Sequence, residues 1–216
     1  MKKRLLIIAS SFIIVFSIII LSKYIYSKLV LHAWKRLDIE YLSQNDNKLY
    51  NACEVTSLLM GLHYKGYVLD KDIFDISDSV PKSDDPSKGF IYSIRDIYPS
   101  DKLHWIDSNA LASFGKSYCN CDVVDSTGYS ILELDKELDK GNPIVIYLTS
   151  GLKDPINKGI PSNLHVYLLA GYNKITLEHY LIDPWRHSDG VTSWVISNDR
   201  INYIYNSVGK RSVIIK

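Results

Sequence analysis

A cysteine at the predicted start of a helix is the residue with the clearest chemical potential. Apolar residues at helical spacing follow Cys53 in the chain; they are Val55, Leu58, Leu59 and Leu62. Asn51 is a suitable N-cap, and Glu54 three residues later completes a pattern that resembles a capping box. Cys53 is therefore expected in the first turn, where free backbone N–H groups and the helix dipole favour the nucleophilic thiolate. The alternative is a small apolar residue that begins a core helix.

A base for such a thiol is found in the C-terminal half of the chain. Residues 164–172 predict a strand with His165 at its start, and a second predicted strand ends at Asp183. If the two strands form a hairpin that turns about Lys174, His165 and Asp183 lie directly opposite each other. The carboxylate could then hold one ring nitrogen and leave the other to accept a proton. The alternatives are a histidine satisfied by the backbone and a turn acid before Pro184.

The other histidines are weaker candidates for the base. His63 follows ten residues after Cys53 on the same predicted helix, too far along it to touch the sulfur. His179 lies on the second strand without an obvious orienting acid, and His187 falls in a polar loop. Two further rivals have no clear context: His32 and His104.

An acyl-transfer site also needs hydrogen-bond donors for a tetrahedral oxyanion. The backbone N–H of Cys53 is one expected donor because it stands at a helix start. Gln44, nine residues upstream, could supply a side-chain N–H. Three asparagines compete for that role: Asn45, Asn47 and Asn51.

Composition limits the class of protein. The 216 residues carry a formal net charge of +1, which gives no reason to expect a nucleic-acid partner. No phosphate-binding loop, dinucleotide-binding turn or internal repeat is visible, and no cofactor is expected. Cys119 and Cys121, two residues apart, are poorly placed for a relaxed disulfide, especially on a strand, where their side chains face the same way but lie too far apart. Two ligands at this spacing make a thin case for zinc. We interpret them as structural or incidental, with a strained or redox-labile bridge as an alternative.

The N-terminal segment predicts a membrane anchor. Residues 5–21 form an uncharged apolar run of 17 residues preceded by Lys2, Lys3 and Arg4, so the N-terminus is expected to stay in the cytoplasm. No small-x-small cleavage site follows, and we favour an uncleaved anchor over a cleaved signal peptide. The predicted organisation is an anchor at 1–22, a tether at 23–42 and one domain at 43–216.

Several other elements can be assigned by pattern. Residues 129–140 predict an amphipathic helix closed by Gly141, and residues 142–149 predict a buried strand. A short helix is expected after Gly66. Residues 90–118 show no clean periodicity, so no element is predicted there.

Together these residues resemble the peptidase C39-like branch of the papain-like cysteine peptidase superfamily, which includes relatives that trim bacteriocin leaders at a double glycine. The resemblance covers roughly residues 40–216. The matching parts are Gln44, N-A-C-E-V-T-S-L-L-M at 51–60, Tyr64, Gly66, D-P-S-K-G-F at 85–90, G-N-P-I-V-I-Y at 141–147, His165, G-Y at 171–172, D-P at 183–184 and the closing S-V-G-K-R-S-V-I-I.

The resemblance implies an α+β, papain-like fold in which the cysteine helix packs on an antiparallel sheet that carries histidine and aspartate. It also implies Cys53 as nucleophile, His165 as base, Asp183 as orienting acid and Gln44 as oxyanion donor. One departure is Ala52, where the family usually has glycine; alanine is expected to fit unless a positive φ is required. No ATP-binding cassette is visible.

The predicted function is a membrane-anchored, extracytoplasmic cysteine peptidase, expected as a monomer without a metal and acting on a peptide or protein substrate. Two alternatives remain open from the sequence. One is a non-catalytic module that binds peptides in the same cleft. The other is an acyltransferase or transpeptidase that resolves the same acyl-enzyme with an amine.

Overall fold

The computed structural model describes residues 14–23, 33–96 and 103–216 of the chain. They belong to two compact units, Met1–Trp34 and Lys35–Lys216. The second unit contains the four residues predicted to form the site, and its architecture is what positions them.

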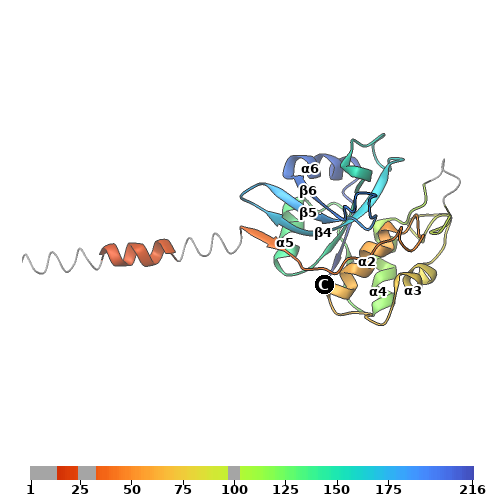
Figure 1. Cartoon of the computed structure of the whole chain (residues 1–216), viewed down its shortest axis with the longest axis horizontal. Helices are drawn as coiled ribbons and strands as arrows, with labels where there is room; N and C mark the ends of the chain where they lie inside the picture. Colours follow the sequence, from red (N-terminus) through yellow and green to blue (C-terminus); the bar gives the residue numbers. More distant parts are fainter. Residues whose placement is uncertain (1–13, 24–32, 97–102) are drawn as a thin grey trace, which may run out of the picture. The chain divides into compact units, whose positions relative to one another are not determined.

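Only part of the predicted membrane anchor, residues 5–21, falls within the described residues. Residues 14–23 are helical (Figure 1). The preceding residues and most of the predicted tether, residues 24–32, lie outside the described part of the chain. Within the described part, no helix is both long and apolar enough to cross a membrane.

The second unit is an α+β structure, as predicted (Figure 1). Its helices are α2 (Cys53–Tyr64), α3 (Ile73–Ser79), α4 (Ser108–Cys119), α5 (Ile131–Asp139) and α6 (Asn198–Ser207), with a 3-10 turn η1 (Ser150–Leu152). Its strands are β2 (Val123–Asp125), β3 (Ile144–Thr149), β4 (Leu164–Asn173), β5 (Glu178–Ile182), β6 (Ser193–Ser197) and β7 (Ser212–Ile215). A short first strand, β1 (Trp34–Arg36), joins this sheet.

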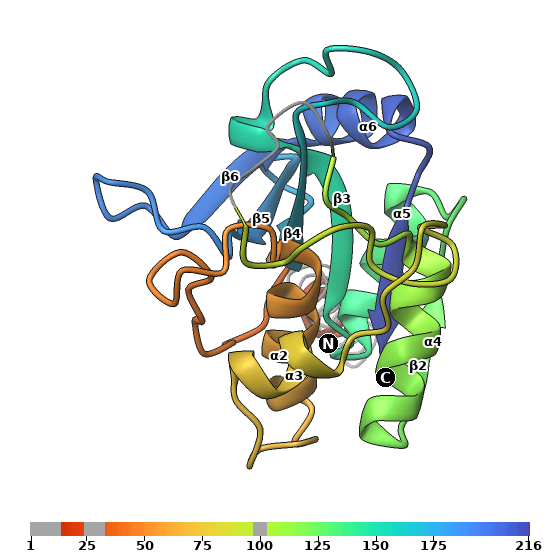
Figure 2. The same ribbon diagram turned by 90° about the vertical axis from the view of Figure 1, so that its right-hand side faces the viewer.

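One twisted sheet separates two layers of helices. The strand order is β2-β7-β3-β4-β5-β6, every pair in this order is antiparallel, and β1 pairs with β4. Helices α2, α3 and α4 lie on one side of the sheet, and α5 and α6 lie on the other (Figures 1 and 2). Two completely buried tyrosines, Tyr147 of β3 and Tyr167 of β4, are among the largest side chains of the core.

The best-patterned segments fold as predicted. The helix predicted at 129–140 is confirmed as α5, and its first turn is a capping box: the Ser130 side chain accepts from the backbone N–H of Glu133, and the Glu133 carboxylate accepts from that of Ser130. The predicted buried strand is confirmed as β3, all of whose residues are buried. The short helix expected after Gly66 is α3.

Helix α4 lies where the sequence predicts no element. Its sequence S-N-A-L-A-S-F-G-K-S-Y-C mixes small and polar residues with few large apolar ones. A Cβ added at Gly115 would stand 3.2 Å from side-chain atoms of Leu58 and Val123, so glycine lets this helix approach α2 and β2 closely. The formation of this helix is therefore determined by tertiary packing, which is only weakly reflected in the periodicity of the sequence.

Cys119 and Cys121 form a disulfide, so interpreting them as incidental is wrong. They do not lie on a strand: Cys119 ends α4, and Asn120 takes the left-handed conformation with φ 50°. This reversal brings the two Cα atoms to 5.1 Å, within the usual range for a disulfide. Because the chain has three cysteines, Cys53 is left as its one free thiol.

The β4–β5 hairpin differs in register from the prediction because its turn lies further along the chain and because β4 contains a bulge. The turn occupies residues 174–177 and is not centred on Lys174. Gly171 pairs with Tyr180, whereas Leu168 pairs with Ile182, so Ala170 is an extra residue in β4. Its carbonyl accepts a hydrogen bond of 2.8 Å from the backbone N–H of Leu37.

The bulge determines which face of the hairpin Asp183 occupies. Without the extra residue, the pairing of Gly171 would continue to set Asp183 opposite Leu168, on the face that His165 does not use. With it, Asp183 continues opposite Tyr167, which shares a face with His165. The predicted direct pairing of His165 with Asp183 is therefore wrong, but the two residues are diagonal neighbours on one face.

The first strand covers β4 beside the bulge. A Cβ at Gly171 would come within 2.4 Å of the Lys35 carbonyl oxygen, so glycine is required for this close approach. The bulge is thus stabilised by the hydrogen bond from Leu37, which follows β1, to Ala170 and by backbone packing of β1 on Gly171.

Candidate functional site

Cys53 is the first residue of α2, as predicted, but the helix begins in a different way. The N-cap is Ala52, and it makes no side-chain cap. Its φ of −99° suits alanine without strain. The Asn51 amide instead donates to the carbonyls of Ser93 and Asp96, at 2.9 and 2.6 Å. The predicted capping box is therefore wrong, and Asn51 fastens the helix start to the loop that follows α3.

The Cys53 sulfur lies against the edge of β4. Because β5 ends its pairing at Ile182, the first residues of β4 have no partner strand on that side. The backbone N–H of Val166 faces the sulfur there and favours the thiolate. Since backbone N–H groups point within the plane of a sheet, the sulfur meets the strand at its edge, one residue from His165.

Glu54 is the second partner of this sulfur. It is 1% exposed, and Cys53 Sγ donates to its Oε2 at 3.2 Å. Burial of the thiol, followed by the Glu54 charge and hydrogen bond, raises the pKa of Cys53 well above its ordinary value. The expectation that the first turn favours the thiolate is therefore wrong for this state, because burial and a neighbouring acid outweigh the helix start.

His165 and Asp183 form the hydrogen-bonded pair that the sequence predicts. His165 Nε2 lies 2.7 Å from Asp183 Oδ1, and the ring stacks edge-on against Tyr167 at a centroid distance of 4.6 Å. With Nε2 engaged, Nδ1 is the ring nitrogen left to accept a proton. Among the described residues, no hydrogen bond joins the His165 ring to the Cys53 sulfur, whose donor bond goes to Glu54.

The Asp183 carboxylate accepts more hydrogen bonds than the sequence reveals. Oδ1 also accepts from the backbone N–H of Trp185 at 3.0 Å, while Oδ2 accepts from His187 Nε2 at 3.0 Å and Trp194 Nε1 at 2.8 Å. Burial raises the pKa of Asp183, but the bond and charge of His165, followed by the Trp194 bond, outweigh it and hold the pKa below its usual value.

His187 and Trp194 are residues that sequence reasoning missed. The sequence places His187 in a polar loop, where nothing in its neighbours distinguishes it from a surface histidine. In the structure it lies four residues beyond Asp183, and its ring packs edge-on against Trp194 at 5.4 Å. A D-P-x-x-H spacing is the one signal that could have suggested this contact.

Gln44 is buried beside the same loop. Its backbone N–H donates to the Pro184 carbonyl at 2.9 Å, and its Nε2 donates to the Tyr50 carbonyl at 3.0 Å. That bond uses one of the two amide hydrogens of Gln44, and its Oε1 has no partner among the described residues. Reciprocal bonds of 2.7 and 2.8 Å between Asn45 and the Arg186 backbone clasp the two loops together.

The asparagines that compete with Gln44 are occupied elsewhere. The Asn45 amide nitrogen donates to the Arg186 carbonyl, and that of Asn47 donates to the Ser43 carbonyl at 2.7 Å. Asn51 points to the loop after α3. Gln44 is the most buried of the predicted donors, with 1% of its surface exposed.

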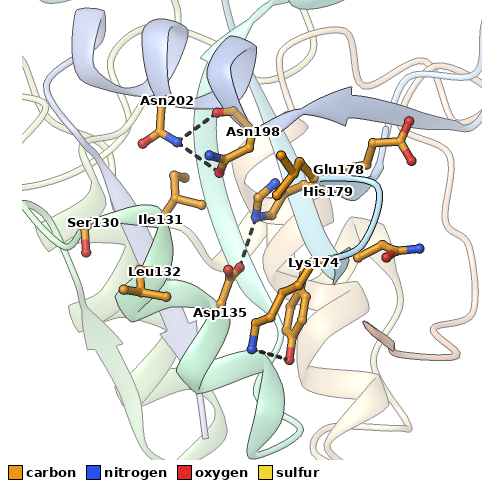
Figure 3. A pocket seen from close by; sticks show the side chains of 12 residues that line it. Ser130, Ile131, Leu132, Asp135, Lys174, Glu178, His179, Asn198 and Asn202 are labelled. Atoms are coloured by element: carbon orange, nitrogen blue, oxygen red, sulfur yellow. Dashed lines mark hydrogen bonds and ion pairs between the residues drawn. The ribbon is translucent and has the colours of Figure 1, made fainter. Parts of the chain in front are cut away.

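His179 has an orienting acid after all, so the sequence-based assessment of this histidine is wrong. Its Nε2 lies 3.0 Å from Oδ1 of Asp135, a residue of α5 that is 44 positions away in the chain. Both line a cavity of about 390 Å³ between α5, α6 and the hairpin turn (Figure 3). His179 pairs with Tyr172, which lies seven residues along β4 from His165, a separation of roughly 23 Å. His179 is therefore remote from the Cys53 thiol.

The remaining histidines do not join the site. His63 contacts the Lys71 carbonyl at 3.1 Å, and His104 contacts the Ser93 carbonyl at 2.7 Å. His32 lies outside the described residues. In the described ranges, no cluster of histidine, cysteine and acidic side chains could hold a metal ion.

Comparison with known proteins identifies the family of this chain. Residues 36–213 match the model of the Peptidase_C39 like family. The chain belongs to this family. A similar curated protein is the uncharacterized protein YvpB of Bacillus subtilis (strain 168), which is 27% identical over 202 residues, covering 84% of this chain and 76% of that protein.

A solved structure supports the fold of this C39-like chain. It is that of a Bacillus anthracis protein assigned to the C39-like peptidases, with a TM-score of 0.72 and 24% identity over 85% of this chain and 97% of that one. The likeness shows that the antiparallel sheet with its packed helices is shared with a C39-like protein.

The buried Glu54 predicts a pH-dependent loss of stability. Burial raises the pKa of Glu54 from 4.5 to about 7. Between these values the unfolded chain releases the Glu54 proton while the folded chain keeps it. The free energy of unfolding should therefore fall by about 3 kcal/mol relative to Glu54→Gln as pH rises through this window. Urea denaturation of both proteins at pH 4.5, 6 and 8 measures the difference, and a constant difference would contradict the buried neutral acid.

Proposed function

We propose that this chain is a cysteine peptidase that hydrolyses peptide bonds with Cys53 as nucleophile, His165 as base and Asp183 as orienting acid. The observation that carries the proposal is the 2.7 Å bond between His165 and Asp183, next to the edge of β4 where the chain's one free thiol lies. Membership of the C39-like family and the fold of its relatives support the same chemistry.

The proposed reaction follows from the atoms left free in the site. His165 Nδ1 accepts the thiol proton, and the sulfur attacks the carbonyl carbon of a peptide bond. The backbone N–H of Cys53 and the second amide hydrogen of Gln44 stabilise the oxyanion. The imidazolium then passes its proton to the departing amine, and water activated by His165 clears the acyl-enzyme. Asp183 holds the ring and stabilises its charge throughout.

The resting arrangement requires one local change before this reaction. The Cys53 sulfur donates to Glu54 instead of to His165. Catalytic hydrogen bonds are often long or misaligned without substrate and tighten when it binds. A rotation of the Cys53 side chain away from Glu54 would free the thiol proton for the imidazole, and β4 would keep its place.

We also propose that residues 5–21 anchor the enzyme in a membrane with the catalytic unit outside the cytoplasm. The support is the uncharged apolar run and the three cationic residues before it.

The anchor predicts resistance of the membrane-bound protein to alkaline carbonate extraction. Replacing Ile13 and Ile14 together by Arg should release it, because each arginine costs about 2.5–3.5 kcal/mol near the centre of a span. Immunoblots of the pellet and supernatant measure the distribution. Equal release of both proteins would argue against the anchor.

Three substitutions test the catalytic roles separately. Cys53→Ala should abolish both peptide hydrolysis and labelling by a thiol-directed activity-based probe. His165→Ala and Asp183→Asn should each lower kcat by about a thousandfold or more, because the thiol loses its base or the ring loses its orientation. Mass spectrometry of peptide products, with and without an added amine, separates hydrolysis from transfer. Full turnover by His165→Ala would sink the assignment.

His187 is predicted to position the Asp183 carboxylate. His187→Leu removes the donor to Oδ2 and should lower kcat by about tenfold with little change in KM, since a bond to a charged group is lost. His187→Gln keeps a side-chain N–H and should recover most of the rate. Steady-state kinetics from pH 5 to 9 measures both, and His63→Leu, at a half-buried site toward the other end of α2 from Cys53, is the matched control. Equal rates for the Leu and Gln variants would show that the bond has no positioning role.

A further inference from the structure

Glu54 is a buried acid that touches the proposed nucleophile. Its Oε2 accepts the thiol hydrogen of Cys53 at 3.2 Å, and its Oε1 accepts from the backbone N–H of Ile106 at 3.4 Å. Among the described residues it forms no salt bridge, although it is 1% exposed. A buried carboxylate without a cation is costly, so its protonation state is coupled to that of its neighbours.

The groups around Glu54 do not neutralise it. The hydroxyl of Tyr147 in β3 donates its hydrogen bond to the Ile106 carbonyl at 2.8 Å. Burial raises the pKa of Tyr147 well above its usual value. Arg211, a nearby cation, is bound to Asp107 at 2.9 Å. Beyond the sulfur lie His165 and the Asp183 carboxylate, and the Asp183 charge further disfavours a thiolate.

One proton can therefore be shared between Glu54 and Cys53 in two ways. The 3.2 Å contact between Cys53 Sγ and Glu54 Oε2 is compatible with both. In the first arrangement, the thiol S–H donates to a carboxylate. In the second, the carboxylic acid O–H donates to a thiolate. If Glu54 and Cys53 are both ionised, two negative charges lie next to each other with no proton between them. This state is the least favourable of the three in a site removed from water.

We propose that Glu54 is a further catalytic residue that sets when Cys53 is nucleophilic. As a carboxylate it holds the sulfur as a thiol; as a neutral acid it donates its O–H to the thiolate. Its place in catalysis rests on the proposed role of Cys53. Transfer of the thiol proton to His165 is then easiest while Glu54 is protonated, because the thiolate that forms has no negative charge on Glu54 beside it. As a result, the thiolate forms less readily once Glu54 ionises.

The pH dependence follows from the same charges. Burial places the pKa of Glu54 at about 7, so both of its forms are populated near neutral pH. Raising the pH through this value adds a negative charge beside the sulfur and opposes its ionisation. The reactivity of Cys53 should therefore rise less steeply with pH than that of an ordinary thiol.

Alkylation of Cys53 by iodoacetamide tests this without any peptidase assay. In the full chain Cys119 and Cys121 are bonded to each other, so mass spectrometry follows modification of Cys53 alone. Glu54→Gln keeps a hydrogen-bond donor at the sulfur and removes the negative charge. We expect this variant to react about tenfold faster at pH 8, a shift of about one pKa unit. An equal or slower rate in a folded Glu54→Gln protein would overturn the proposal.

Two controls separate a charge effect from a loss of structure. Glu137→Gln removes another buried acid, one that bonds to Lys140 and Asn142, and should leave the alkylation rate unchanged. Near-UV circular dichroism checks that Glu54→Gln stays folded, because an unfolded chain would also react faster. A faster rate in the Glu137 variant as well would show that the effect does not come from Glu54.

A reciprocal measurement decides the matter if Glu54→Gln does not fold. The Cys53 bond lowers the pKa of Glu54, so Cys53→Ala should raise it, as linkage requires. Carboxyl ¹³C NMR measures this pKa, and an unchanged value would overturn the coupling.

Absence of peptide hydrolysis would overturn the proposed function and leave these thiol measurements intact. Conversely, uncoupled Glu54 and Cys53 would leave the roles of His165 and Asp183 untouched.

Discussion

One additional residue in β4 determines which face of the hairpin carries Asp183. Ala170 shifts the pairing of β4 with β5 by one position, and Asp183 consequently shares a face with His165. Side chains alternate strictly along a strand, so no adjustment of rotamers could replace this shift. The bond between His165 and Asp183, and everything that depends on an oriented imidazole, follows from a backbone irregularity that lies five residues beyond His165.

Asp183 is also where separate segments of the site meet. Its two oxygens collect donors from β4, from the loop after β5 and from β6. The same loop is clasped to the segment that carries Gln44 through Asn45 and Arg186. A displacement of this loop would therefore alter the imidazole orientation and the Gln44 position together. A carboxylate that accepts several bonds at once is well suited to hold such a junction in place.

The sequence predicts the regular parts of this architecture and the identity of the main chemical groups. Strong periodicity and capping residues are local signals, and they give α5 and β3 correctly. The α+β class and the contact between His165 and Asp183 also follow from the sequence. Helix α4 is not predicted because its small residues serve packing against α2 and β2. Those contacts lie outside any local window of the sequence. The register of the β4–β5 hairpin could not be predicted because a bulge has no reliable sequence signature beyond Gly171.

The environment of the thiol could not be predicted, for a different reason. Glu54 has the right spacing for a helix cap, and spacing alone cannot tell whether a carboxylate turns back toward the backbone or inward. Asn51 is drawn away by carbonyls of Ser93 and Asp96, contacts between segments about 40 residues apart that only the folded chain reveals. Because Asn51 does not form a capping box with it, the Glu54 side chain is free to face the Cys53 sulfur.

The pairing of β1 with β4 also limits where the second unit can be separated from the N-terminal segment without loss of structure. The backbone of Lys35 covers Gly171, and Leu37 supplies the hydrogen bond to the bulge carbonyl. Proteolytic cleavage upstream of Trp34 would leave this edge intact. A cut even a few residues later would remove the strand that covers the bulge, so the remaining unit would lose the support that keeps Asp183 and the His165 imidazole on one side of the hairpin.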